Sequence, residues 1–299
     1  MTMPVLTVFT PTYNRAHTLP RTYESLCRQT CRDFEWLVID DGSTDGTAAL
    51  IKSWQEENKI PIRYIHKENG GLYTVYNTAY ENIRTELNVC VDSDDYMPDN
   101  AVETIVETWQ AKGSDKYAGL LGLDFYTDGK PIGGYFPDSL TESHFLDLYV
   151  RKIHRGDTKP VYRSDLTRRY APMAGFPGEK NFNPVYIALQ IDNELPLLIV
   201  NKNLCYVEYQ ETDSMSKNIF AQYFNSPRSF SKMRRLEMTH SRSSLKNNLR
   251  VTAHYIATSL ISRDKRFIAA SPRRLMTVMM LPFGVALYFY MKHKYNSGR

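Results

Sequence analysis

Three carboxylates that could hold a metal ion lie close together near residue 90. Asp92, Asp94 and Asp95 fall within four positions, directly after the β-prone run 87–91. Acids this close repel one another unless their charge is compensated. The usual compensation is Mg²⁺ or Mn²⁺, held by one or two carboxylates together with water and phosphate oxygens. The segment therefore indicates a strand that ends at a metal–diphosphate site, and the alternative is a strand followed by a solvated acidic turn.

The elements that must position these acids alternate regularly through the first hundred residues. The pattern predicts strands at 5–9, 34–39, 62–65 and 87–91, and helices at 19–28, 47–57 and 73–84. Such alternation is typical of βαβ units, so we expect an α/β fold with a doubly wound, mostly parallel sheet covered on both faces. Further on, the sequence predicts a helix at 101–111, a hairpin of strands 119–125 and 130–136 around Asp128-Gly129, and a strand at 159–163.

Polar, glycine-rich or acidic residues follow each of the first four predicted strands. In a parallel sheet, ligands bind beyond the carboxyl ends of the strands. The four segments, 11–14, 40–43, 67–71 and 92–95, would therefore meet at one edge, which favours a metal–nucleotide site over a solvated turn. Neither a Gly-x-Gly-x-x-Gly nor a Gly-x-x-x-x-Gly-Lys-Ser/Thr segment is present, which disfavours nicotinamide enzymes and phosphate-loop hydrolases.

These four segments resemble the motifs of a known enzyme family. The segments are Thr-Pro-Thr-Tyr-Asn-Arg at 10–15, Val-Ile-Asp-Asp-Gly-Ser-Thr-Asp at 38–45, Asn-Gly-Gly at 69–71 with Asn77 following, and Asp-Ser-Asp-Asp at 92–95. They are similar in order and spacing to the family-2 glycosyltransferases of the GT-A fold, of the bacterial capsule, exopolysaccharide or lipopolysaccharide type. The resemblance implies a UDP-sugar donor, Mn²⁺ or Mg²⁺, and inversion at the anomeric carbon.

The resemblance also implies roles for individual residues. Asp41 is expected to accept a hydrogen bond from the imide N–H of uracil, as suits an ionised acceptor. Asp94 and Asp95 are expected to face ribose and metal, with Asp92 supporting them; Asp94 is thus also expected to be catalytic. The full nucleotide-binding set implied by the resemblance is Pro11, Tyr13, Asp40, Asp41, Lys67, Asn69, Asp92 and Asp94.

An inverting transfer needs a carboxylate that takes the proton of the acceptor hydroxyl. Glu179 is the candidate, because Gly-Glu-Lys at 178–180 resembles the Gly-Glu-Asp or Gly-Glu-Lys segment of capsule-type relatives. The sequence departs from that pattern at Lys180, where many relatives have Asp, and at Pro184, where an acid is expected; the alternative for Glu179 is a solvated surface acid. The segment 208–216 resembles the mobile lid that lies near the metal and phosphates in relatives: Ser214 and Ser216 match its pattern, whereas its usual histidine is absent.

The charge is distributed unevenly along the 299 residues. The net charge is +4, yet residues 228–299 contain 15 Lys and Arg against two acidic residues, Glu237 and Asp264. We expect three regions: a nucleotide-sugar-binding half at 1–100, an acceptor-binding half at 101–216 and a basic helical region at 217–299. The four cysteines form no Cys-x-x-Cys pair and the N-terminus shows no secretory signal, which together predict a reduced, cytoplasmic protein.

The basic region predicts contact with a membrane. An amphipathic helix is expected at 245–260, and 275–291 is a run of seventeen uncharged residues between cations, interrupted by Pro282 and Gly284. A bilayer span takes about 20 apolar residues, so this run suits an interfacial segment on the anionic inner leaflet. The alternative is a core helix. Nucleic acid is not expected as a partner, because the aromatic residues cluster with aliphatic ones.

The expected activity is that of a hexosyl- or N-acetylhexosaminyltransferase bound peripherally to the cytoplasmic face of the cell membrane. The acceptor would be lipid-linked through polyprenyl diphosphate, or a saccharide. Two other classes stay open: a nucleotidyltransferase, which should have a basic glycine-rich loop after its first strand, and a non-catalytic sugar-nucleotide-binding module, which tolerates loss of any base.

Overall fold

The computed structural model describes residues 3–208 and 219–297. Its contacts divide the chain into unit 1, Met1–Pro172 with Glu194–Glu208, and unit 2, Met173–Asn193 with Tyr209–Arg299. Residues 173–193, expected in the acceptor-binding half, thus belong to the same unit as the basic C-terminal helices. Each unit is described by itself.

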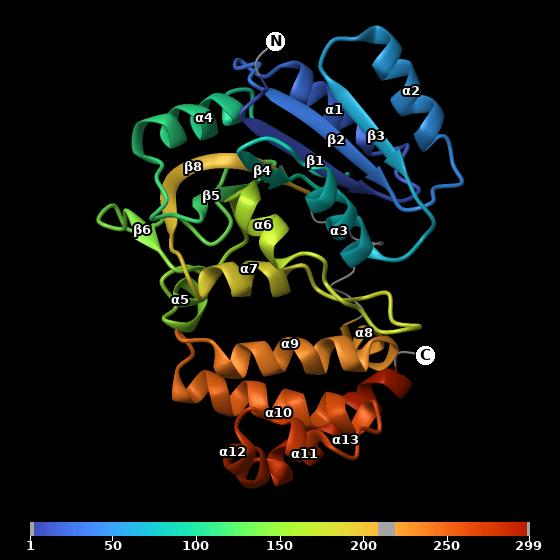
Figure 1. Ribbon diagram of the computed structural model, residues 1–299, viewed down its shortest axis with the longest axis vertical. Helices are drawn as coiled ribbons and strands as arrows, with labels where there is room; N and C mark the ends of the chain where they lie inside the picture. The colour runs from blue at the N-terminus through green and yellow to red at the C-terminus, as the bar shows by residue number, and fades with distance from the viewer. Residues whose placement is uncertain (1–2, 209–218, 298–299) are drawn as a thin grey trace. The chain divides into compact units, whose positions relative to one another are not determined.

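Unit 1 is built on an eight-stranded sheet with the order β3-β2-β1-β4-β7-β5-β8-β6 (Figure 1). The first four strands are parallel, as predicted, whereas β7 is antiparallel to both β4 and β5. β8 runs parallel to β5, and the short β6 closes the sheet antiparallel to β8. The strands are β1 Leu6–Thr12, β2 Phe34–Asp40, β3 Ile62–His66, β4 Leu87–Cys90, β5 Gly119–Tyr126, β6 Glu142–Ser143, β7 Thr158–Arg163 and β8 Leu197–Val207.

Helices cover both faces of this sheet. α1, α2 and α4 share one hydrophobic core with strand residues such as Val8 and Trp36, while α3 covers the other face, where Phe9 packs edge-on against Tyr76 and Tyr80. α6 lies beside α3 (Figure 1). This is the layered α/β arrangement that the alternating pattern predicts. The helices of unit 1 are α1 Leu19–Cys27, α2 Thr47–Glu57, α3 Leu72–Asn82, α4 Ala101–Lys112, α5 Phe145–Val150 and α6 Ser164–Tyr170.

The hairpin expected after β5 is formed only at its turn. Tyr126 N donates to Lys130 O at 2.9 Å, but the expected strand 130–136 is not a strand, and its pairing is limited to a single bridge between Phe125 and Pro131. Pro131 has no N–H to donate, and the two following glycines, 133 and 134, adopt positive φ angles of 80° and 90°. The prediction of a second strand here was wrong because these residues turn the backbone away from β5.

Unit 2 is helical, and α10 is its central element. Val251, Tyr255 and Ile256 of α10 are fully or almost fully buried, and the helix packs against both α9 and α13. α10 is therefore a core helix, and Leu245, at its first position, is its one large apolar residue that is exposed. The helices are α7 Val185–Asp192, α8 Ile219–Asn225, α9 Pro227–Thr239, α10 Leu245–Ile261, α11 Phe267–Ala270, α12 Arg274–Met279 and α13 Leu281–Ser297.

The uncharged run 275–291 forms α12 and most of α13. The break falls at Met280, and Pro282 lies in the first turn of α13, where a missing N–H costs nothing. Gly284 lies inside α13, and a Cβ there would come within 2.4 Å of the Ile256 Cβ, so the glycine permits close packing on α10. Across the described ranges, no helix has both the length and the apolar character needed to span a bilayer.

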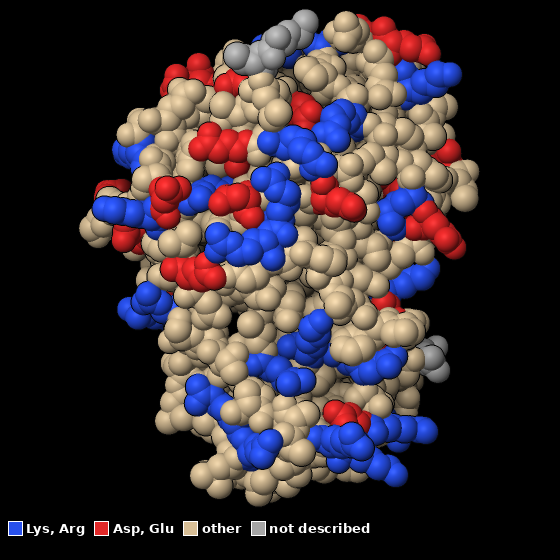
Figure 2. Space-filling model, in the orientation of Figure 1, with Lys and Arg blue, Asp and Glu red and all other residues tan. Residues whose placement is uncertain are grey.

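One side of α12 and α13 is buried and the other is not. Thr277, Gly284 and Met291, spaced by seven residues, face the interior of unit 2. Large apolar side chains on other sides of the same helices are exposed: Leu275, Met279, Phe283, Phe289 and Tyr290, which we call the apolar stripe. On the face that Figure 2 draws, Lys and Arg dominate the charged surface over the helices of unit 2.

Candidate nucleotide and metal site

The carboxyl ends of the parallel strands lie level with one another. Thr12, the last residue of β1, pairs with Asp40, the last residue of β2, and Asp40 pairs with His66 at the end of β3. Hydrogen bonding continues one residue further, because Asp41 N donates to Thr12 O at 2.9 Å. The segments that follow these strands therefore meet at one edge of the sheet, as the sequence predicts.

Asp41 organises the glycine turn that follows β3. Its carboxylate accepts hydrogen bonds from Lys67 Nζ at 2.6 Å, from Gly70 N at 3.0 Å and from Gly71 N at 2.8 Å. Asn69 Nδ2 donates to the Asp41 carbonyl at 2.9 Å. Gly71 has a φ of 89°, a conformation that other residues adopt only with strain. A carboxylate can accept about four hydrogen bonds, and these three leave one acceptor position, on Oδ2.

Asp40 is the fully buried member of the pair. Its carboxylate accepts from Ser43 N at 2.8 Å and from Tyr64 Oη at 2.6 Å. Burial alone would raise the pKa of Asp40, but the hydrogen bonds from Ser43 and Tyr64 outweigh it and lower the pKa. Asp40 is thus a buried anion whose carboxylate accepts hydrogen bonds from other residues of the protein.

Tyr13 is an exposed aromatic residue directly after β1. Its side chain is 49% exposed at the end of β1, whereas Pro11 is buried within that strand. The turn that presents Tyr13 is tied to the segment after β2, because Asn14 N donates to Ser43 Oγ and Thr44 N donates to Asn14 Oδ1, both at 2.8 Å. The loops after β1 and β2 therefore form one connected structure.

The acidic cluster follows β4 in a tight turn, in which Asp95 N donates to Asp92 O at 3.0 Å. Asp92 is exposed, Asp94 half-buried and Asp95 buried. Burial, together with the neighbouring Asp92, raises the pKa of Asp94. Burial likewise raises the pKa of Asp95, to about 8, with Lys159 opposing the shift. A bound cation would favour the charged form of these carboxyl groups, because a nearby positive charge lowers the pKa of an acid.

Two residues of α1 hold the backbone of this turn. Thr22 Oγ1 donates to Asp95 O at 2.7 Å, and Arg21 Nη2 donates to Asp94 O. The Arg21 guanidinium also lies 4.9 Å from the centre of the Tyr96 ring. Sequence reasoning missed both roles, because a carbonyl acceptor leaves no pattern in the residues around it.

A buried cation that the sequence analysis also missed lies beside the cluster. Lys159 Nζ is 3.5 Å from Asp124 Oδ1 and 4.0 Å from Asp95 Oδ2, and the side chains of all three are at most 10% exposed. Burial would lower the pKa of Lys159, but the neighbouring Asp124 outweighs it and raises the pKa. The available signal was a single Asp inside the apolar run 119–125, since a charge in a buried strand needs a partner.

The residues present fit a metal ion that is held by two protein carboxylates and otherwise by water and the phosphate oxygens of a bound nucleotide. Within residues 3–208 and 219–297, no group of three His, Cys, Asp or Glu side chains could hold a metal ion by itself. Mg²⁺ normally binds through one or two carboxylates plus water and phosphate oxygens, and the exposed and half-buried carboxylates of Asp92 and Asp94 supply that number. Asp95 is turned toward Lys159 instead.

Glu179, the predicted base, lies in unit 2 and is 6% exposed. Its Oε1 accepts from Arg228 N at 3.1 Å and Arg228 Nε at 3.0 Å, and its Oε2 accepts from Ser229 N at 2.8 Å. The carboxylate thus accepts from two backbone N–H groups in the first turn of α9. A capping side chain at the start of a helix makes the same kind of bond. Its role as base stays a prediction. The expected lid residues Ser214 and Ser216 lie outside the described residues.

Comparisons with known proteins agree with this geometry. Residues 7–152 match the model of glycosyl transferase family 2. The glycosyltransferase GlyA of Streptococcus pneumoniae is 30% identical over 144 residues, which is 48% of this chain and 20% of GlyA. The matches to the first three curated relatives cover between 20% and 50% of their lengths.

Solved structures share the fold. S. aureus TarS 1-349 in complex with UDP superposes with a TM-score of 0.60 at 17% identity, covering 98% of this chain and 92% of TarS 1-349. The mannosyltransferase PcManGT from Pyrobaculum calidifontis, in complex with GDP-Man and Mn²⁺, superposes with a TM-score of 0.55 at 17% identity, covering 97% and 88%. The four strand-end motifs, the sheet and these matches agree on a domain of the glycosyl transferase family 2 type at residues 7–152, on a GT-A-type fold.

Proposed function

We propose that the chain moves one sugar, with inversion, from a UDP-sugar to a lipid-linked or saccharide acceptor in bacterial surface polysaccharide synthesis. The observation that carries the proposal is the edge of the sheet at which the Asp41 carboxylate, the exposed Tyr13 ring and the acidic turn 92–95 follow neighbouring strands. The UDP complex of TarS, a protein of the same fold, supports UDP as the carrier.

The chain's own residues would divide the work as follows. Tyr13 would stack on the base, Asp41 would accept from uracil, and Asp92 and Asp94 would hold Mn²⁺ or Mg²⁺, as the Mn²⁺ complex of PcManGT supports. When bound, the cation neutralises charge on the diphosphate. The acceptor oxygen bonds to the anomeric carbon as the bond from that carbon to the diphosphate oxygen breaks. The hydroxyl proton passes to a carboxylate, for which Glu179 is the candidate, and UDP leaves.

The proposed location is the inner leaflet of the membrane, to which the chain would bind peripherally. Support comes from the apolar stripe, whose members Leu275 and Phe283 are 77% and 64% exposed. Exposed cations lie at both ends of the stripe, at 273–274 and 292–294, and the sequence has no acid after Asp264. Apolar side chains between cations match an interface of acyl chains and anionic headgroups.

The deciding experiment measures UDP release. The intact protein is supplied with a panel of UDP-sugars, with lipid-linked and free saccharide acceptors, and with Mn²⁺ or Mg²⁺. We expect release that a chelator abolishes and that Asp94→Asn loses. Asp99→Asn is the matched control, because Asp99 is an exposed acid just beyond the cluster, paired with Arg28. UDP binding without turnover would indicate the non-catalytic module, and no UDP binding would overturn the proposal.

A further inference from the structure

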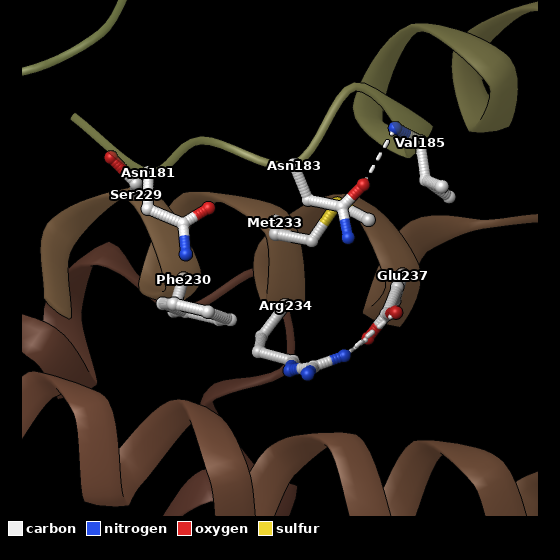
Figure 3. A pocket seen from close by; sticks show the side chains of 8 residues that line it. All are labelled: Asn181, Asn183, Val185, Ser229, Phe230, Met233, Arg234 and Glu237. Atoms are coloured by element: carbon white, nitrogen blue, oxygen red, sulfur yellow. Dashed lines mark hydrogen bonds and ion pairs between the residues drawn. The ribbon is translucent and has the colours of Figure 1, made fainter. Parts of the chain in front are cut away.

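A cavity of about 190 Å³, partly open to solvent, lies in unit 2 between the loop before α7 and one side of α9 (Figure 3). Its α9 lining falls at positions 229, 230, 233, 234 and 237, the spacing of a single helical face. The loop contributes Asn181 and Asn183, and Val185 completes the lining from the start of α7.

The size of the cavity limits its occupant. Its 190 Å³ is several times the roughly 30 Å³ that one water takes in the liquid. It is also smaller than the roughly 300 Å³ at which pockets for drug-sized ligands begin. A single six-membered ring with its substituents is the size class that fits, whereas a nucleotide does not.

Charge in the cavity is already balanced. Arg234 Nη1 donates to both carboxylate oxygens of Glu237, at 2.8 and 2.6 Å, and its Nη2 donates to Tyr223 Oη at 3.3 Å. Neither charge is therefore left over to attract an ion, so an anion such as phosphate and a metal cation are both disfavoured. The lining favours a neutral ligand.

Hydrogen-bonding capacity in the lining is not used up. Ser229 Oγ and Arg234 Nε are buried and have no hydrogen-bond partner among the described residues. Asn183 Oδ1 accepts from Val185 N at 2.9 Å, and this bond leaves its amide Nδ2 free to donate (Figure 3). Buried polar groups normally find partners, and here donors and acceptors lie around one small space. A hydroxyl both donates and accepts, so a ligand with several hydroxyls matches this lining.

The remaining lining is apolar. Phe230, Met233 and Val185 complete the wall. A pyranose has the same division, with hydroxyls around its rim and C–H groups on its faces. We propose that this cavity binds a single neutral pyranose, the sugar of the acceptor that receives the transferred residue. The second half of this assignment rests on the proposed glycosyltransferase function; sugar binding by the cavity does not.

The cavity and the predicted base share one turn of α9. Ser229 lines the cavity, and its backbone N–H donates to Glu179 Oε2 at 2.8 Å. A sugar in the cavity would therefore be held by the same turn that fixes Glu179. This connection favours an acceptor sugar over a ligand unrelated to the reaction.

The test is saturation-transfer NMR on the full chain with a panel of neutral methyl pyranosides at millimolar concentration, without metal or UDP-sugar. We expect at least one glycoside to bind. Val185→Phe, which fills the cavity, should weaken binding about tenfold or more, and Asn183→Ala, which removes one hydrogen-bond donor at an exposed position, should weaken it severalfold. Arg235→Ala is the control, because Arg235 is exposed on the same helix but does not line the cavity.

The outcomes separate this proposal from the proposed function. No binding of any glycoside overturns the cavity assignment, as does binding that survives both cavity variants in folded protein, judged by an unchanged melting temperature. UDP titration of the same samples reports on unit 1 alone. Glycoside binding without UDP binding would support a sugar site and refute the transferase. UDP turnover in both cavity variants with an unchanged KM for the acceptor would refute the acceptor role.

Discussion

Lys159 and Asp124 form a buried ion pair between the neighbouring strands β7 and β5, with 3.5 Å between Nζ and Oδ1. Asp95 Oδ2 lies 4.0 Å from the same ammonium, so one internal cation faces two carboxylates. The pair links the sheet to the acidic turn after β4. Asp95 is thus buried beside a cation, whereas Asp92 is exposed.

Removing this cation should destabilise the protein strongly. Breaking a buried ion pair by deleting one partner costs about 3–5 kcal/mol. We expect Lys159→Met to lower the free energy of unfolding by that amount, and Lys159→Met with Asp124→Asn to recover part of it. Denaturant titration measures both. Lys130→Met is the control, because its pair with Asp128 is exposed and should contribute little to stability. Equal losses from the two lysine substitutions would contradict the buried-pair interpretation.

Asp41 should be needed for the glycine turn as well as for uracil. Asp41→Asn replaces an acceptor of two backbone N–H groups by a side chain that is half donor, which leaves a buried group unsatisfied at a cost of about 1–3 kcal/mol. We expect at least tenfold weaker UDP binding in calorimetry and a lower melting temperature. Glu68→Gln removes the same charge from an exposed side chain of the same loop and should change neither.

His254 makes the stability of the protein depend on pH. Burial, with smaller contributions from Arg234 and Arg250, lowers its pKa to about 4 from 6.5. Between these values the unfolded chain binds the proton more tightly, so stability falls as pH drops from about 6.5 to 4, by up to about 3 kcal/mol. His254→Gln should flatten this part of a plot of unfolding free energy against pH. His293→Gln, at an exposed histidine, should leave it unchanged.

The apolar stripe should govern membrane binding. We expect the intact protein to float with vesicles that contain anionic lipid, and to bind neutral vesicles less, because each headgroup contact by a cation is worth about 1 kcal/mol. Met279→Glu and Phe283→Glu should each reduce flotation severalfold. Leu245→Glu, at an apolar side chain that is 67% exposed on α10 and outside the stripe, is the control. Flotation that persists in both stripe variants would refute this surface.

Glu179 has two separable tasks, and one substitution distinguishes them. If it caps α9 only, Glu179→Gln lowers stability by about 1 kcal/mol and leaves kcat unchanged. If it is also the base, kcat falls by about 10²–10⁴ and its dependence on pH changes. Arg228→Ala removes the side-chain bond to Glu179 but keeps the backbone one, and so controls for the environment of the carboxylate.

The sequence predicted the first half of unit 1 well, because its strands and helices have strong periodicity and short connections. The expected strands 34–39 and 62–65 match β2 and β3 to within one residue, and the expected helix 47–57 has the bounds of α2. Parallel strands bring their carboxyl ends to one edge of a sheet. The alternating pattern of strands and helices therefore also predicted that the segments containing Asp40 and Lys67 lie close together.

Features that depend on long-range pairing were not predicted. Lys159 meets Asp124 and Asp95 only because β7 lies between β4 and β5, antiparallel to both, and nothing in its neighbouring residues indicates that order. Residues 130–136 follow the turn signal Asp128-Gly129 and were therefore expected to form a strand, but a proline and two glycines turn them away from β5. The sequence predicted Glu179 as the catalytic base. Its hydrogen bonds to α9 were not predicted, because they involve residues about fifty positions away.

Thr277, Gly284 and Met291 are spaced by seven residues and lie on the buried side of α12 and α13. The residues that pack these helices on unit 2 are therefore different from those that face outward. Gly284 lets α13 approach α10 closely, and Leu275, Met279 and Phe283 are mostly exposed, so the packing of α12 and α13 within unit 2 depends little on these three side chains. Bulk and polarity on the outer side can therefore change during evolution, or by design, without loosening the helices from their own unit.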